Sequence, residues 1–168
     1  MKLYLKQKVF SWGDKFWVYD ESGNERYSVR GEVFTIGKKL HVYDGTEREV
    51  VMIRQKIWSF LPRYYLEKDG EIFAEVVKRF TLFHPRYEVP QFGWTVAGDF
   101  LAHNYCIRSG EETVAQISKK WFAWGDTYEV DFGPASDHVQ VLAVVLVIDA
   151  CLAAESAASA SVAASSAN

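Results

Sequence analysis

Cysteine is scarce in this 168-residue sequence, which contains only Cys106 and Cys151. The two residues are far apart in the chain and neither belongs to a metal-binding or redox motif, which argues against a disulfide scaffold or a cysteine metal site. Charge interrupts the opening segment Met1–Lys6 and no apolar core follows it, so we expect no signal peptide. These features together predict a reduced, cytoplasmic protein.

The motifs of known enzyme classes are also missing. The sequence has no glycine-rich phosphate loop, no Gly-x-Ser-x-Gly elbow and no His, Cys or carboxylate cluster at metal-ligand spacing. His84 and His103 fall in predicted turns and could approach each other, although solvated turn histidines are the simpler interpretation. We therefore predict no catalytic residues, no metal and no cofactor. An enzyme of unrecognised type is the last of three functional hypotheses.

Positive charge is not in excess, because 19 Lys and Arg residues are offset by 22 Asp and Glu residues, which gives a formal net charge of −3. Nucleic-acid-binding domains usually have a basic balance, so no nucleic-acid partner is expected. Aromatic residues, by contrast, are abundant at 15% of the sequence. The length fits one domain that can bury a sizeable core.

Many of the aromatic residues belong to a pattern that occurs six times along the chain. Each copy has a large apolar residue, a three-residue turn, then an aromatic residue or leucine, any residue, and Val, Leu or Ile. The copies are Trp12–Val18, Ile36–Val42, Phe60–Leu66, Phe83–Val89, Leu101–Ile107 and Trp124–Val130. Such alternation predicts a strand, a tight turn and a return strand in each copy. A glycine follows each copy and indicates the next chain reversal.

Six hairpins predict twelve antiparallel strands. An open sheet of this size would leave two edges free to pair with other chains, and closure into a barrel removes them. About eight strands is the size whose interior side chains fill completely, so a twelve-stranded barrel needs something else in its centre.

The segment best suited to that centre is Val139–Leu152, which is apolar on all sides. Asp137 followed by Gln140 has the spacing of a capping box, so we predict a helix over residues 137–152 that is required for folding. Its predicted core positions are Val141, Leu142, Val145, Leu146 and Ile148. A buried strand and a membrane span remain as alternatives. The span is disfavoured because Asp149 ends the apolar run, and an ionised Asp in lipid costs roughly 2.5–3.5 kcal/mol.

The predicted fold is therefore mainly β, a closed twelve-stranded antiparallel barrel around a buried C-terminal helix, in a single domain spanning residues 1–152. Residues 153–168 are rich in Ala and Ser and have too little apolar surface to form a core. They predict either a frayed extension of the helix or a tail, and no function can be assigned to them.

Several segments resemble the LURP-one-related family. They are Lys6–Ser11, Asp20–Asn24, Arg54–Pro62, Gly93–Phe100, Ile117–Phe122 and Val141–Ala150. The resemblance covers residues 1–152 and implies the tubby C-terminal-like fold, a twelve-stranded barrel around a hydrophobic helix that is also found in the phospholipid scramblases. Tubby proteins bind phosphoinositides and tether to membranes. Their ligand residues have no identifiable counterparts here, and a scramblase-like calcium segment is missing from the sequence.

One feature of the charge distribution bears on function. If the hairpins run up and down, the six repeat turns lie at one end of the barrel and carry mostly basic residues: Lys15, Lys38, Lys39, Arg63 and Arg86. The turns at the opposite end are rich in Asp and Glu. Charges of solvated turns are the simplest interpretation, but a basic rim facing an anionic surface is the functional one.

The leading hypothesis is accordingly a non-enzymatic barrel that binds anionic lipid headgroups through this rim, with a location peripheral to the membrane. The alternative is a protein-interaction module that uses exposed aromatic residues such as Trp17 or Tyr65.

Overall fold

Twelve strands and one long helix make up the computed structural model, which describes residues 1–6, 15–32, 36–80, 85–122 and 125–165. The strands are β1 (Lys2–Lys6), β2 (Lys15–Asp20), β3 (Glu25–Gly31), β4 (Lys39–Asp44), β5 (Glu49–Gln55), β6 (Arg63–Lys68), β7 (Glu71–Arg79), β8 (Arg86–Val89), β9 (Trp94–Asp99), β10 (Asn104–Ser109), β11 (Glu112–Phe122) and β12 (Gly125–Phe132). A short 3₁₀ helix, η1 (Pro90–Phe92), joins β8 to β9, and the C-terminal helix is α1 (His138–Ser165).

The strands form a closed antiparallel barrel in which each strand pairs with its neighbours along the chain. Closure joins the first strand to the last, with Lys2 opposite Asp131 and Lys6 opposite Thr127. No strand edge is therefore left open in the described ring. The predicted strand number, antiparallel pairing and closure are confirmed.

The repeat pattern sets which residues face the interior. The last position of all six copies is completely buried, at Val18, Val42, Leu66, Val89, Ile107 and Val130. Two residues before it stands Tyr64, Tyr87, Tyr105 or Tyr128 in four copies, and each of these tyrosines is also buried. Successive side chains of a strand alternate between its two faces, so both positions fall on the inner face.

The first position of the copies does not fit the prediction. Ile36, Phe60 and Leu101 do not end a strand but lie in turns, where they are 85%, 106% and 81% exposed. Some of the turns are also longer than three residues, since residues 56–62 separate β5 from β6. Period-two alternation cannot distinguish an exposed apolar turn residue from the last inward residue of a strand, which explains the error. The starts of the other copies, Trp12, Phe83 and Trp124, lie outside the described residues.

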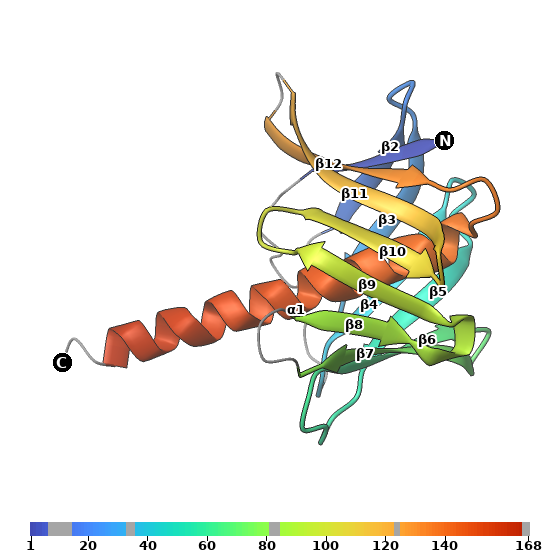
Figure 1. The fold of residues 1–168 in the computed structure, drawn as a ribbon. Coiled ribbons are helices and arrows are strands. Elements are labelled where there is room, and N and C mark those ends of the chain that lie inside the picture. Colours follow the sequence, from blue (N-terminus) through green and yellow to red (C-terminus); the bar gives the residue numbers. More distant parts are fainter. Residues whose placement is uncertain (7–14, 33–35, 81–84, 123–124, 166–168) are drawn as a thin grey trace.

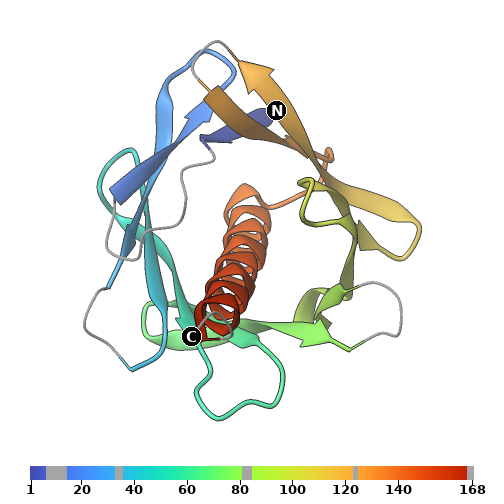
Figure 2. The same cartoon turned by 90° about the vertical axis from the view of Figure 1, so that its left-hand side faces the viewer.

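Helix α1 passes through the centre of this ring, which Figure 2 shows in a view along the barrel. Asp137 caps it as predicted, because its Oδ1 accepts hydrogen bonds from the backbone N–H groups of Val139 (2.9 Å) and Gln140 (3.0 Å). All eight residues from Val141 to Ile148, including the five predicted core positions, are at most 1% exposed. The buried central helix is confirmed.

Of the two alternatives predicted for residues 153–168, an extension of the helix is the one observed. The helix does not end at residue 152 but continues to Ser165, and its C-terminal part projects beyond the strands (Figure 1). Alanine has the highest helix propensity and neither Gly nor Pro follows Leu152, so the helix has no stop signal there. Over His138–Ser161 it is long and apolar enough to cross a membrane, but 61% of its most apolar 18-residue window is buried inside the barrel.

The two ends of the barrel differ because the helix starts at one and leaves at the other. We call the first the N-cap end; it contains Asp137 and the turns 21–24, 45–48, 69–70, 90–93 and 110–111. We call the second the helix-exit rim; its described turns are residues 32 and 36–38, 56–62, 80 and 85, and 100–103. The helix passes this rim at Glu155, which pairs with Lys78 near the end of β7.

Candidate functional site: the helix-exit rim

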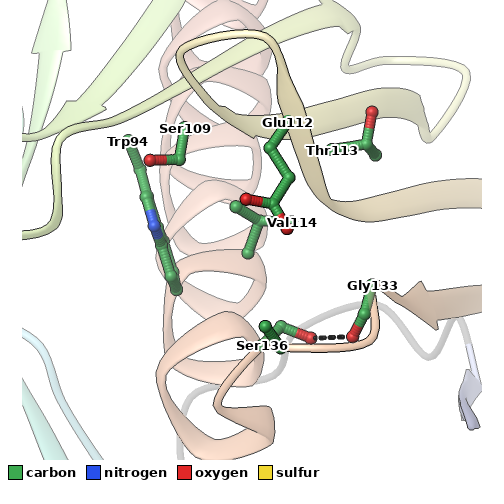
Figure 3. A pocket seen from close by; sticks show the side chains of 8 residues that line it. Trp94, Ser109, Glu112, Thr113, Val114, Gly133 and Ser136 are labelled. Atoms are coloured by element: carbon green, nitrogen blue, oxygen red, sulfur yellow. Dashed lines mark hydrogen bonds between the residues drawn. The ribbon is translucent and has the colours of Figure 1, made fainter.

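A small cleft lies at the N-cap end (Figure 3), with a volume of about 160 Å³. Trp94, Glu112 and Ser136 are among the residues that line it, and Ser136 Oγ donates a hydrogen bond to the Gly133 carbonyl at 2.8 Å. Pockets for drug-sized ligands are usually about 300–1,000 Å³. The cleft is therefore large enough only for water or a ligand of a few atoms.

Large exposed apolar side chains gather at the opposite end, the helix-exit rim. There Trp58 is 97% exposed and Phe80 82% exposed. Within the part of the chain that the structure describes, the set comes from four turns of this rim and consists of Ile36, Ile57, Trp58, Phe60, Phe80 and Leu101. Among the described residues, only Met1 and Ile72 are comparable elsewhere, and both are at the N-cap end. Apolar side chains concentrated on one surface mark a site of interaction with a partner or a membrane.

The five predicted rim cations have different surroundings. Lys15 Nζ lies 3.7 Å from Glu47, Lys39 Nζ lies 3.2 Å from Glu32, and Arg63 Nη1 lies 3.2 Å from Glu75. Arg86 is exposed, and no ion pair of its side chain is found within the described part of the chain. Lys38 is half-buried, and burial lowers the pKa of its ammonium group. The rim is thus less strongly basic than its sequence suggests, and the ligand-binding role of these residues stays a prediction.

Lys78 is a further cationic residue at the helix-exit rim, and it was not among the residues predicted from the sequence. Its Nζ pairs with Glu155 of α1 and lies 5.8 Å from the centroid of the Tyr87 ring. Cys151, one helical turn before Glu155, is buried beside Tyr64 and Tyr87. Burial raises the pKa of the Cys151 thiol to about 11, so the thiol is neutral and packs as an apolar residue.

Deeper in the barrel, three polar residues meet: Asp149 of α1, Tyr128 of β12, and His103 at the end of the turn that carries Leu101. The Tyr128 hydroxyl donates a hydrogen bond to Asp149 Oδ2, and His103 Nδ1 lies 3.8 Å from Asp149 Oδ1. The His103 and Tyr128 rings stack with their centroids 4.7 Å apart. Burial raises the pKa of Asp149 well above its usual range. Burial, reinforced by the positive charge of Lys119, lowers the pKa of His103.

The predicted alternative interface is partly covered. Trp17 and Tyr65 are only partly exposed, because Lys15 Nζ lies 5.1 Å from the Trp17 ring and the Arg54 guanidinium 5.1 Å from the Tyr65 ring. These two aromatic side chains therefore offer less free apolar surface than Trp58 or Phe60 does.

The histidines form no metal-ligand cluster with Cys, Asp or Glu within the described residues. His41 bridges Glu32 and Glu49 on the outer face, with nitrogen to oxygen distances of 2.7 and 2.6 Å. His138 packs on Phe132, and His84 lies outside the described residues. The predicted absence of catalysis, metal and cofactor stays a prediction.

The rim residues that sequence reasoning missed do have a sequence signal. Residues 57–60, Ile-Trp-Ser-Phe, come just before the predicted turn at residues 61–63. Pro62 in this turn has no backbone N–H to donate, which favours an earlier end of the strand. The inward orientation of Lys78 could have been inferred from strand alternation, because it is two residues after the inward-facing Val76.

Comparison with other proteins agrees with the fold. A model of the LURP-one-related family matches residues 1–149. The chain is similar to the uncharacterised protein YxjI of Bacillus subtilis, with 33% identity over 152 residues that cover 90% of this chain and 94% of that protein.

An X-ray structure of a protein from Arabidopsis thaliana has a similar fold, with a TM-score of 0.63 and 19% identity, covering 89% of this chain and 90% of that one. At this identity the structural likeness shows the fold alone. The family match over almost the entire chain, together with the closed barrel around a central helix, shows that this chain belongs to the LURP-one-related family.

Proposed function

We propose that this protein is a binding barrel that attaches to the surface of an anionic membrane through its helix-exit rim. The observation that carries the proposal is the segregation of the exposed apolar side chains Ile36, Trp58, Phe60, Phe80 and Leu101 to that one end. In solution these side chains are exposed to water, which costs free energy. Insertion among lipid headgroups and acyl chains removes that cost. Trp in particular favours the interface between membrane and water.

Charge supports an anionic surface as the partner. Basic residues flank the apolar ones in the turns: Lys38 follows Ile36, Lys56 precedes Ile57, and Arg86 stands near Phe80 in sequence. Each Lys or Arg close to an acidic membrane contributes about 1 kcal/mol, and the contribution falls with added salt. The acidic turns at the N-cap end are repelled by the same surface, so attraction and repulsion both favour the same orientation.

Co-sedimentation with vesicles tests this function. We expect wild-type protein to sediment with vesicles of phosphatidylserine and phosphatidylcholine more than with phosphatidylcholine alone. The double variant Trp58→Ser/Phe60→Ser should lose at least about tenfold in partition, because full burial of each large apolar side chain contributes about 1.5–3 kcal/mol.

The matched control is Ile72→Ser, which removes an exposed apolar side chain at the N-cap end and should sediment like wild type. Equal loss in both variants, or no vesicle binding by the wild-type protein, would end the proposal. Stable association with a soluble protein that depends on Trp58 and Phe60 would instead favour a protein-interaction module.

A further inference from the structure

Two lysines of the helix-exit rim point into the barrel. Lys78 is opposite Tyr87 in the ladder between β7 and β8, and directly opposite residues of an antiparallel pair share a face. Because Tyr87 is a buried core residue, Lys78 also faces inward. Lys38 immediately precedes β4, and its carbonyl accepts a hydrogen bond from the Gln55 N–H at 2.8 Å, which extends the pairing with β5. It lies two residues before the buried Leu40, so alternation turns it to the same inner face. Each lysine therefore extends its ammonium group toward α1.

Both lysines approach the helix at the same residue. The Cys151 thiol interacts electrostatically with Lys38 and with Lys78, and it also neighbours the hydroxyl groups of Tyr64 and Tyr87. Two ammonium groups and two hydroxyl groups thus surround one short stretch of helix. Burial is the main reason that the pKa values of both tyrosines are raised, so these hydroxyls keep their protons and can donate hydrogen bonds.

One of these two ammonium groups, that of Lys78, already has a carboxylate beside it. Glu155 pairs with Lys78, but the side chain of Lys78 is 18% exposed whereas that of Glu155 is 50% exposed. A largely buried ammonium group needs an anion beside it, since an unpaired buried charge is costly. Glu155 can return to water at little cost because it is half solvated. The buried cation therefore favours an anion at this point more strongly than it favours this particular carboxylate.

We propose that Lys38, Lys78, Tyr64 and Tyr87 form a subsite for a phosphate group, and that Glu155 occupies it until a phosphate replaces the carboxylate. A phosphate group supplies several strong acceptor oxygens and more negative charge than a carboxylate, which matches two ammonium and two hydroxyl donors. The phosphate can belong to a lipid headgroup or to a free phosphate ester. The first case rests on the proposed membrane function, because the exposed Ile36, Trp58 and Phe80 belong to turns next to the same strands.

Titration of four proteins tests the subsite: wild type, Lys38→Met/Lys78→Met, Glu155→Gln and the control Lys68→Met. Methionine keeps the unbranched apolar chain but removes the charge, and Lys68 is an exposed lysine at the N-cap end. One arm titrates glycerol 3-phosphate by calorimetry. The other measures sedimentation with vesicles of phosphatidic acid in phosphatidylcholine. We expect the double variant to bind at least about tenfold more weakly in an arm where wild type binds, Glu155→Gln to bind about fivefold more tightly, and Lys68→Met to match wild type.

Binding that responds to these variants only in the vesicle arm identifies the phosphate as a lipid headgroup, and a response with glycerol 3-phosphate identifies a phosphate ester in general. Either result supports the subsite. Unchanged affinity of both the double variant and Glu155→Gln in both arms overturns it. If wild type sediments with no vesicles, the proposed membrane function fails, and the glycerol 3-phosphate arm alone decides the subsite. If the double variant does not fold, Glu155→Gln still gives the test, since its side chain is half exposed.

Discussion

At the scale of single residues, the least expected feature is a carboxyl group in the middle of an apolar core. Asp149 is 6% exposed and accepts a hydrogen bond from Tyr128. Its Oδ1 and the hydroxyl of Tyr105 have no hydrogen-bond partner among the described residues. Burial raises the pKa of Asp149 and lowers that of His103, so both shifts favour the neutral side chains. Neutral forms avoid the large cost of an ion in this interior.

The raised pKa of Asp149 predicts a pH dependence of stability. Below the unfolded pKa of about 4, both states bind the proton; above it the unfolded chain releases it while the folded chain keeps it. Stability therefore falls as pH rises toward the folded pKa, by up to about 1.4 kcal/mol per pH unit.

The lowered pKa of His103 acts in the opposite direction, but only below about pH 6.5, where the unfolded chain binds that proton. Urea titrations of wild type and Asp149→Asn from about pH 4.5 upward isolate the carboxyl group, because the contribution of His103 is common to both proteins. The stability of wild type relative to the variant should fall as pH rises above the unfolded pKa of about 4. Parallel slopes would show that Asp149 is ionised in the folded protein.

A second prediction at this scale concerns Gly98, whose φ is +144°. A Cβ at this position would lie 2.5 Å from Tyr105 Cα, a backbone atom of the paired strand β10 that cannot move aside. We expect Gly98→Ala to destabilise the fold by at least about 2 kcal/mol, as judged by urea denaturation. Gly45→Ala is the control, because nothing lies within 4 Å of its Cβ position. Equal stability of the two variants would mean that β9 and β10 separate easily at this point.

At the scale of elements, the sequence predicted the barrel well because a strand's inner face follows from alternation and the helix from uniform apolarity. The last positions of the copies, such as Val18, Val42 and Val130, are completely buried, as this alternation requires. The turn residues were not assigned correctly, since exposure in a turn depends on where the paired strands end. The C-terminal limit of α1 was missed for a related reason, because nothing in an Ala-rich segment marks the point where a helix leaves its barrel.

The two parts of α1 predict different effects of truncation. Val141–Ile148 fills the interior, whereas residues 155–161 are exposed. A chain that ends after Ala157 keeps the Lys78–Glu155 ion pair and should unfold cooperatively within a few degrees of the full-length melting temperature. A chain that ends after Gly133 loses the helix and should not fold as a soluble monomer. Circular dichroism melts and gel filtration compare the two, and a cooperatively folding monomer of the shorter chain would refute the central role of the helix.

At the scale of the whole molecule, the important asymmetry is between the two ends of the barrel. Sequence reasoning proposed a binding rim at the end of the barrel that carries the repeat turns, which is the helix-exit rim, and it included Lys38, but it attributed binding to charge alone. The side chain of Lys15 reaches Glu47 in the turn between β4 and β5, and that of Arg63 reaches Glu75 on the neighbouring strand β7, so part of the predicted basic charge is neutralised. The exposed apolar turns could not be predicted from charge. They depend on the three-dimensional arrangement that brings four separate turns to one rim.

The orientation of the barrel on a membrane tests this account most directly. An environment-sensitive fluorophore is attached at Ser59→Cys, in the turn of Trp58, or at Ser22→Cys, in a turn of the N-cap end, with Cys106 replaced by Ser; the buried Cys151 stays unlabelled. Anionic vesicles that contain nitroxide-labelled lipids then report which label approaches the bilayer. The account predicts strong quenching of the label at position 59 and little at position 22. Equal quenching at both positions, or stronger quenching at position 22, would contradict it.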